Sequence, residues 1–228
     1  MSKCVTVYTQ AYNVENYIEQ CIKSVLSQTF QDFEWILVEN GSTDKTREII
    51  RKYAALDERI KPDYFDVNQD GFTNYYIAEK ADGRYIVKID SDDWIEPEYL
   101  EKLIAPFEDP DVDISICGAV NYEEETGRET PHEYGELDGV YSKSDIEKQF
   151  IEMRSYMGTY WGKMFRREIF CSILPDMKEI GEKLKKGDNF GGDVAFALCY
   201  LGECKKLAFV NERMYHYRIH NNSYATRT

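Results

Sequence analysis

The sequence is short of basic residues, histidine and long apolar runs, and each shortage excludes a class of protein. Its 228 residues hold 28 Lys and Arg against 42 Asp and Glu, a net charge of −14, and only 3 His. Nonspecific nucleic-acid binding needs clustered basic side chains that displace counterions, so we expect no nucleic-acid partner. The longest apolar runs, such as 35–38 and 114–117, have strand length, whereas a membrane-spanning helix needs about 20 residues.

The six cysteines form no Cys-x-x-Cys pair, and most of them stand inside apolar segments. This pattern favours buried free thiols in a reducing compartment over disulfides or a zinc site. Residues 1–10 lead directly into a strand pattern and lack the apolar core of a signal peptide. We therefore expect a cytoplasmic protein.

Length and composition favour a folded chain. With 43% apolar and 14% aromatic residues, the chain can bury a sizeable core, and its length fits one domain over residues 1–228. Residues 1–120 alternate between strand and helix periodicities, which predicts an α/β fold with a mostly parallel central sheet flanked by helices. We expect strands at 5–9, 34–39, 60–65, 84–89 and 114–119, and helices at 13–28 with Asn13 as the N-cap, after Ser42-Thr43-Asp44, at 74–81, and after Pro97.

The second half, residues 121–228, has a different character. Residues 121–139 are polar, acidic and interrupted by glycine, which predicts a hairpin or an exposed excursion. The pattern further predicts a helix at 144–153, a mobile loop rich in Gly and Lys at 180–192, a helix at 193–201, and two strands at 207–210 and 214–217.

Three carboxylates follow the apolar strand that ends near Ile89. Asp90 and Asp92 lie two positions apart, so in an extended chain both side chains point the same way. Two carboxylates at the carboxyl end of a strand repel each other unless a cation lies between them, and this end is where open α/β sheets bind ligands. Hard oxygen ligands suit Mg²⁺ or Mn²⁺, which also bind phosphate, so we predict a metal–phosphate site. Capping of the next helix is the alternative, and Asp93 suits that role.

Two weaker groups of polar residues follow the first and second strands. Asn40 precedes a glycine turn at the sheet edge, where it can hydrogen-bond a base or ribose, although any strand–turn–helix unit needs such residues. Gln10 and Tyr12 follow the first strand, and the tyrosine is either a stacking platform for a nucleobase or a packed lid.

Taken in order, these segments resemble the family 2 glycosyltransferases of the GT-A fold. That family reads P-x-Y-N after the first strand, S-x-x-x-Q-T-[YF], D-G-S-T-D, G-x-Y-[IV]-x-x-[LI]-D-S-D-D, W-x-K-L-[FY], E-D and Y-x-Y-R-x-H-x-x-S. The matching residues here are Tyr12-Asn13, Ser24 with Gln28-Thr29-Phe30, Asn40-Gly41-Ser42-Thr43-Asp44, Gly83 through Asp93, Trp161 with Lys163 and Phe165, Asp193, and Tyr215 through Ser223. The ordered set spans almost the whole chain.

The resemblance implies an inverting, metal-dependent transferase that moves a sugar from a nucleotide-diphosphate donor, such as a UDP-sugar, to a hydroxyl of a glycan or lipid-linked acceptor. It implies roles in donor binding for Gln10, Tyr12, Asn40, Asp90, Asp92 and Arg218, metal binding for Asp92 and His220 with Mn²⁺ or Mg²⁺, general-base catalysis for Asp193, and an acceptor side that includes Trp161 and Lys163. Residues 1–120 would then bind the nucleotide-sugar, and residues 121–228 would carry the acceptor side and the base. The product would be a bacterial-type surface polysaccharide or a similar glycoconjugate.

Several positions depart from the family pattern. Gln10 stands at the usual proline, Asn40 at the usual aspartate, and Gly192 at the usual glutamate, and the A-R-N element after the N-x-G loop is absent. Without the resemblance, Asp193 reads as the N-cap of an apolar helix and His220 as a surface histidine.

Two other classes of protein remain open at this point. A noncatalytic nucleotide-sugar-binding module of the same fold would explain the departures. A dinucleotide-dependent Rossmann enzyme is disfavoured, because no G-x-G-x-x-G follows the first strand. The sequence leaves open the donor base and sugar, the acceptor, homo-oligomerisation, peripheral membrane contact and any further C-terminal segment.

Overall fold

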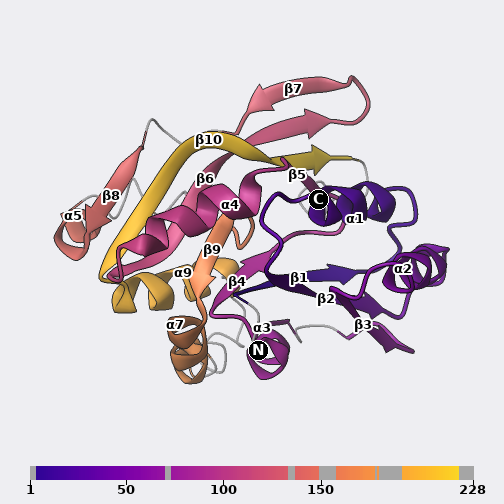
Figure 1. Cartoon of the computed structure of the whole chain (residues 1–228), viewed down its shortest axis with the longest axis horizontal. Helices are drawn as coiled ribbons and strands as arrows, with labels where there is room; N and C mark the ends of the chain where they lie inside the picture. Colours follow the sequence, from indigo (N-terminus) through magenta and orange to yellow (C-terminus); the bar gives the residue numbers. More distant parts are fainter. Residues whose placement is uncertain are drawn as a thin grey trace.

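The computed structural model describes residues 4–69, 73–132, 137–148, 158–177, 179 and 192–220. Within them, the strands form one ten-stranded sheet, whose main path runs in the order β3-β2-β1-β4-β9-β6-β10-β5 (Figure 1), with β7 paired to β6 and β8 paired to β10. The strands are β1 (Val5–Ala11), β2 (Phe33–Asn40), β3 (Ile60–Phe65), β4 (Tyr85–Lys88), β5 (Trp94–Ile95), β6 (Val112–Glu123), β7 (Arg128–Pro131), β8 (Gly139–Ser142), β9 (Lys163–Arg166) and β10 (Lys206–Ile219).

Helices cover both faces of this sheet. The helices are α1 (Ile18–Leu26), α2 (Thr46–Ala54), α3 (Thr73–Lys80), α4 (Tyr99–Ile104), the 3₁₀ helix η1 (Ala105–Glu108), α5 (Lys143–Lys148), α7 (Arg167–Ser172) and α9 (Gly192–Glu203). Side chains of α1, α2 and α4 share one buried apolar cluster with one face of the sheet, and side chains of α3, α7 and α9 share a second cluster with the other face. The α/β fold class predicted from the sequence is therefore confirmed.

The first four strands along the chain pair in parallel, as the alternating periodicities predict. β1 lies between β2 and β4 in parallel register, and β2 pairs with β3 in parallel. Val7, Trp35 and Val87 of this sheet are completely buried. Apolar strands covered on both faces are typical of parallel sheets, because the crossover helices pack on each side.

The second half makes the sheet mixed rather than mostly parallel. β9 runs antiparallel between β4 and β6, and both β5 and β8 run antiparallel to β10. β6 and β7 form the hairpin expected over 121–139. β10 nevertheless pairs in parallel with β6 along most of its length, so this half combines both strand directions, and strand periodicity alone does not fix them.

The first helix starts later than predicted. α1 begins at Ile18, and Asn13 does not cap it but lies in the left-handed region with φ 52°. The backbone N–H of Val14 donates to Thr46 Oγ1 at 2.9 Å, and that of Glu15 donates to Asp44 Oδ2 at 3.0 Å. These long-range bonds anchor Val14 and Glu15 to the start of the α2 segment, ahead of the first turn of α1.

The last two predicted strands are one strand. β10 runs without interruption from Lys206 to Ile219, with irregular register against β6 between Val210 and Tyr215. The polar residues Asn211 and Glu212 predict a break, but they occupy this irregular stretch, where the strand bends and continues. β5, with two residues, is too short to be detected by periodicity.

Some predictions lie outside the described residues. These are the end of the 144–153 helix, of which the structure describes α5 as far as Lys148, and the loop at 180–192, of which it describes only Gly192 at the start of α9. All six cysteines are free thiols, of which Cys21, Cys117 and Cys204 are buried and the others partly exposed. Over the described part of the chain, no helix is both long and apolar enough to cross a membrane.

Candidate active site

The acidic turn Asp90–Asp93 lies at the carboxyl end of β4, beside the carboxyl end of β1. Parallel pairing of β1 and β4 brings these two ends to the same edge of the sheet, where α/β folds bind ligands. Asp93 is almost fully buried, at 1% exposure, whereas the side chains of Asp90 and Asp92 are 34% and 27% exposed. Two carboxylates therefore face solvent at this edge while the third belongs to the core.

The end of β10 binds this turn through Tyr215 and Arg218. The Asp90 N–H donates to the Tyr215 hydroxyl at 3.1 Å, and this hydroxyl donates to Asp93 Oδ2 at 2.7 Å. The Arg218 N–H donates to Asp93 Oδ1 at 2.8 Å, and Arg218 Nε donates to the Asp92 carbonyl at 2.8 Å. The conformation of the acidic turn is thus fixed by residues about 125 positions later in the chain.

Burying the Asp93 carboxylate beside two other carboxylates is electrostatically unfavourable. Burial and the neighbouring carboxylates of Asp92 and Asp90 raise the pKa of Asp93 well above its usual value. Burial and Asp90 also raise the pKa of Asp92, while the hydrogen bond from His220 acts in the opposite direction. The turn therefore concentrates negative charge that a cation would relieve.

His220 and Asp92 form the closest pair of potential metal ligands in the site. His220 Nε2 lies 3.0 Å from Asp92 Oδ2, and its ring packs on Tyr17 with centroids 4.6 Å apart. The two residues are 128 positions apart in sequence, and the fold places them in contact; their role as metal ligands stays a prediction. Among the residues that the structure describes, no group of three or more His, Cys, Asp or Glu side chains is arranged to hold a metal ion.

Arg218 is buried inside an aromatic cage. It is 6% exposed, and its guanidinium carbon lies 5.0, 4.7 and 5.4 Å from the ring centroids of Tyr17, Trp94 and Tyr122, which are the cage residues. Its terminal nitrogen also donates to Gln20 Oε1 at 2.6 Å. The geometry makes Arg218 a support for the acidic turn and for α1.

Lys88 is a site residue that the motifs do not identify. Its Nζ lies 3.2 Å from Asp90 Oδ1 and 5.3 Å from the centroid of the Tyr160 ring. The signal in the sequence is its spacing, because a side chain two positions before Asp90 on an extended strand points to the same side. Asp93 and Tyr215 both belong to motifs recognised in the sequence, but only the fold shows that they are hydrogen-bonded to each other.

Asp193 starts α9 and interacts electrostatically with the acidic turn. Desolvation by surrounding atoms raises its pKa, and Asp90 raises it further, while Lys88 and Lys163 lower it. The residue as a whole remains exposed. Asp193 is therefore a solvent-accessible carboxylate close enough to the edge of β4 to interact with both of its charged residues.

Trp161 and Lys163 are buried beneath this edge. The Trp161 ring is 5% exposed and stacks between Tyr215 and Tyr217 at centroid distances of 4.8 and 5.4 Å. Lys163 is completely buried, and its Nζ donates to Thr159 Oγ1 at 2.9 Å and to the Trp161 carbonyl at 3.1 Å. Burial lowers the pKa of Lys163 to about 7. Trp161 therefore supports the tyrosine that holds the acidic turn.

The predicted contacts to the base lie at the carboxyl ends of β1 and β2. Tyr12 is 43% exposed just after β1, and Gln10 is partly buried near the end of that strand. Asn40 is buried, and its amide is bonded to the next loop: its nitrogen donates to Asn68 Oδ1 at 2.7 Å and its oxygen accepts from the Gln69 N–H at 2.9 Å. Only Tyr12 presents an exposed ring to solvent here.

The Ser24–Phe30 motif has a structural role. The Gln28 side chain is buried; its Nε2 donates to the Glu96 carbonyl at 2.7 Å, and its Oε1 accepts from the Leu100 N–H at 2.9 Å. Ser24 Oγ accepts from the Ile95 N–H at 3.3 Å. The motif thus fixes the segment that follows the acidic turn against the end of α1.

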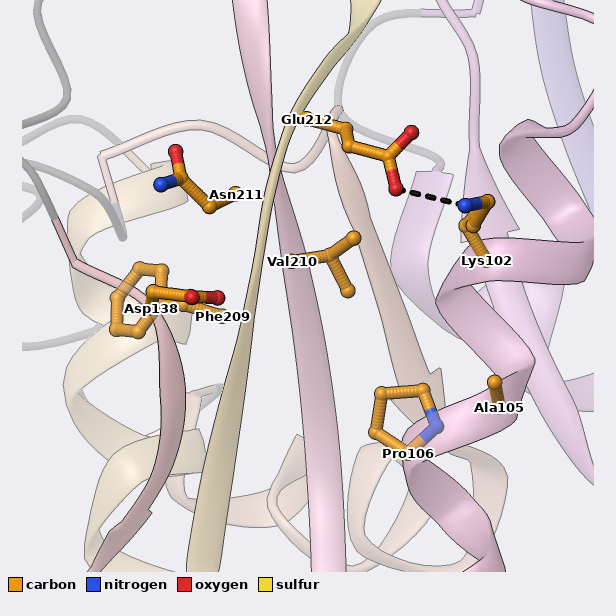
Figure 2. A pocket seen from close by; sticks show the side chains of 8 residues that line it. All are labelled: Lys102, Ala105, Pro106, Asp138, Phe209, Val210, Asn211 and Glu212. Atoms are coloured by element: carbon orange, nitrogen blue, oxygen red, sulfur yellow. Dashed lines mark hydrogen bonds and ion pairs between the residues drawn. The ribbon is translucent and has the colours of Figure 1, made fainter.

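A separate open groove of about 480 Å³ lies between α4, η1 and β10 (Figure 2). An ion pair between Lys102 Nζ and Glu212 Oε1, 2.8 Å apart, crosses one side of it, and Ala105, Pro106 and Val210 supply apolar surface. None of its lining residues belongs to the acidic turn. The chemistry-bearing residues therefore lie elsewhere, at the carboxyl edge of the sheet.

Comparison with known proteins gives a family and a fold. The sequence profile described as "Glycosyl transferase family 2" matches residues 6–174. The chain is 30% identical to "Putative glycosyltransferase EpsH" of Bacillus subtilis, over 98% of the chain and 63% of the relative. It is 29% identical to "Glycosyltransferase GlyA" of Streptococcus pneumoniae, over 96% of the chain and 31% of the relative. The chain spans less than two thirds of the length of both relatives.

Solved structures with the same fold include two that hold nucleotide-sugars. One is S. aureus TarS 1-349 in complex with UDP-GlcNAc, with a TM-score of 0.74 and 20% identity over 99% of this chain and 61% of that chain. The other is the mannosyltransferase PcManGT from Pyrobaculum calidifontis in complex with GDP-Man and Mn²⁺, with a TM-score of 0.64 and 16% identity over 98% and 59%. At these identities, the similarity establishes the fold.

Proposed function

Because the chain belongs to glycosyl transferase family 2, we propose that it transfers a sugar from a nucleotide-diphosphate donor to a hydroxyl of a glycan or lipid-linked acceptor. The TarS structure of the same fold holds UDP-GlcNAc, which favours a UDP-sugar as the donor. The product would be a surface polysaccharide or a similar glycoconjugate.

One observation carries this proposal. His220 contacts Asp92 of the acidic turn, and the Asp193 carboxylate, from another distant part of the chain, interacts electrostatically with Asp90 of the same turn. A donor that binds at the pair would extend its sugar toward Asp193. Neither helix capping nor core packing requires this combination.

The donor would bind along the carboxyl ends of β1, β2 and β4. Tyr12 would stack on the base, and Asp90 would accept a hydrogen bond from the ribose. Gln10, at the end of β1, would line the same part of the site. Asn40 would act by holding the loop at Asn68 and Gln69 rather than by direct contact, since this loop occupies its amide.

The residues present fit a divalent ion. Asp92 Oδ2 and His220 Nε2 lie 3.0 Å apart at a turn with excess negative charge. Mg²⁺ and Mn²⁺ take oxygen and imidazole ligands and complete their shells with phosphate oxygens and water, so two protein ligands suffice. Such an ion, when bound, would supply positive charge to the departing diphosphate.

Asp193 would act as the general base. An acceptor hydroxyl is a weak nucleophile, and a carboxylate that removes its proton as the bond forms contributes about 10²–10⁴ in rate. The oxygen attacks the anomeric carbon while the bond to the diphosphate breaks, so one direct displacement inverts the anomeric configuration. Lys163, electrostatically coupled to Asp193, and Trp161 would support this acceptor side from below.

Ligand-induced stabilisation tests the donor site. The melting temperature is measured with UDP, GDP and other nucleoside diphosphates, each with and without Mn²⁺. We expect one nucleotide to stabilise the protein in a metal-dependent manner, and Asp92→Ala to abolish that shift. A ligand at 100 times its dissociation constant stabilises the folded state by about 2.7 kcal/mol, which is easily measured. Absence of a shift with every nucleotide would refute the donor site.

Slow hydrolysis of the donor separates an enzyme from a binding module. We expect Asp193→Asn to reduce hydrolysis by about 10²–10⁴ while the stabilisation by nucleotide remains. Binding without turnover of any donor by the wild-type protein would instead favour a noncatalytic nucleotide-sugar-binding module.

A further inference from the structure

We propose that Lys88 is a positioning residue of the transfer site, which holds the Asp90 carboxylate and balances the charge between Asp90 and Asp193. This inference rests on the proposed function. Lys88 occupies a variable position of the Gly83–Asp93 motif, at the end of β4, where it contacts Asp90 and interacts electrostatically with Asp193.

The contacts of Lys88 define its position. Its side chain is 22% exposed, with Nζ 3.2 Å from Asp90 Oδ1 and 5.3 Å from the Tyr160 ring centroid. Tyr160 is itself fixed, because its hydroxyl bonds to Asn74 Nδ2 at 2.6 Å and its ring packs on Phe196 at a centroid distance of 4.5 Å. Phe196 lies on α9 three residues after Asp193, so the lysine is connected to that helix through a rigid aromatic contact.

Lys88 keeps its positive charge at neutral pH, unlike Lys163. Burial acts to lower its pKa, but the carboxylates of Asp90 and Asp193 outweigh it, and the pKa of Lys88 is raised. Lys163 is the other lysine that acts on Asp193, and burial lowers the pKa of Lys163 to about 7. Lys88 is therefore the cation that stays charged across the neutral pH range.

This placement has a consequence for the reaction. Asp193 must be ionised to accept a proton, and Asp90 must keep its orientation to bind the donor. Asp90 raises the pKa of Asp193 and Lys88 lowers it, so removal of Lys88 leaves the effect of Asp90 less opposed. Of the described groups, those that act on Asp193 are Lys88 and Asp90 from the end of β4, and Lys163 and Tyr160 from β9 and the segment before it.

The test compares Lys88→Met and Lys88→Arg with Lys80→Met. Lys80 on α3 is a matched control, because it also lies near a carboxylate and a tyrosine ring. Its Nζ is 3.9 Å from Asp63 Oδ2 and 5.5 Å from the centroid of the Tyr76 ring, and it lies outside the site. We expect Lys88→Met to lower donor hydrolysis at least tenfold and to move the acid limb of its pH profile upward by about one unit. Lys88→Arg should restore most of the rate and the profile, and Lys80→Met should change neither. Equal profiles for Lys88→Met and the wild type would overturn the inference.

A double-mutant cycle tests the same coupling without turnover. The denaturation midpoints of Lys88→Met, Asp193→Asn and the double variant are measured in urea. We expect Lys88→Met to lower the midpoint and the added Asp193→Asn to recover part of that loss, because the carboxylate that needed the cation is gone. Additive changes would overturn the inference. If the wild-type protein binds no nucleotide, the proposed function is refuted, but the coupling between Lys88 and Asp193 can still be measured.

Discussion

The hydroxyl of Tyr215 connects two residues of the acidic turn, since it accepts from the Asp90 N–H and donates to Asp93 Oδ2. Tyr215→Phe keeps the ring and its stack on Trp161 but leaves a buried N–H and a buried carboxylate without this partner. We expect a loss of about 1–3 kcal/mol in the free energy of unfolding and a smaller nucleotide-induced shift in melting temperature.

Tyr217→Phe is the control for this substitution. It removes a hydroxyl from the same strand and keeps the stack on Trp161, and it leaves the hydrogen bonds of the acidic turn intact. Equal effects of the two substitutions on nucleotide binding would show that the Tyr215 hydroxyl does not organise the turn.

The buried Lys163 makes the stability depend on pH. Its pKa is about 7 in the folded protein, whereas an unfolded lysine keeps its proton up to about 10.5. Between these values the unfolded state binds more protons, so stability rises with pH by up to about 1.4 kcal/mol per unit. Below pH 7 both states are protonated, and the full cost of the buried charge remains.

Lys163→Met should remove this component. We expect the unfolding free energy of the wild type to rise, relative to that of the variant, between pH 7 and pH 9 in urea titrations. Parallel curves for the two proteins would show that the lysine keeps an ordinary pKa.

At the scale of single residues, the sequence indicates which side chains can carry chemistry more readily than it indicates which side chains touch one another. The spacing of Asp90 and Asp92 singles out the acidic turn, and the resemblance names Asp92 together with His220, which lie 3.0 Å apart. The aromatic cage of Arg218 could not be foreseen, because Tyr17, Trp94 and Tyr122 come from three separate segments, and donor binding by Arg218 stays a prediction. Residue type alone does not distinguish a guanidinium that binds phosphate from one that supports a turn.

At the element scale, the end of α1 controls the segment after the acidic turn. The Gln28 amide bonds to the Ser24 and Glu96 carbonyls and to the Leu100 N–H, and it is 1% exposed. Gln28→Ala would leave these buried backbone groups without this partner. We expect a loss of about 2–4 kcal/mol in the free energy of unfolding, measured in urea, because each unmade buried hydrogen bond costs about 1–3 kcal/mol.

The matched control for Gln28→Ala is Ser27→Ala, at the residue immediately before it. The Ser27 hydroxyl bonds only within its own helix, to the Ser24 carbonyl at 3.0 Å, and it is exposed. A loss for Gln28→Ala no larger than that for Ser27→Ala would contradict the role of Gln28.

The bounds of elements with a clear local sequence pattern could be predicted, whereas the bounds of elements fixed by contacts distant in sequence could not. β2 is an apolar run covered on both faces, and its bounds agree with the sequence to within one residue at each end. α1 starts later than predicted, after a segment in which the Val14 and Glu15 N–H groups donate to Thr46 and Asp44, more than 25 positions away. β10 continues through polar residues because β6 pairs along it on both sides of the irregular stretch.

At the scale of the whole molecule, the charge of −14 acts on any anionic donor. Long-range repulsion slows the approach of a nucleoside diphosphate, and salt screens it, with a Debye length of about 30 Å at 0.01 M and about 8 Å at 0.15 M. We expect the association rate constant, measured by stopped flow, to rise between these ionic strengths. The rate for the parent nucleoside should not change. A fall with salt would instead indicate a locally positive approach to the site.

The bonds between β10 and the acidic turn also set an order of events during protein synthesis. The carboxylates of the acidic turn leave the ribosome about 125 residues before the part of β10 that holds them. Until that strand emerges and docks against β6, the nascent chain carries an unsupported cluster of acids and an incomplete sheet. Contacts so distant in sequence are slow to form, so we expect the acidic turn to reach its final conformation late in folding.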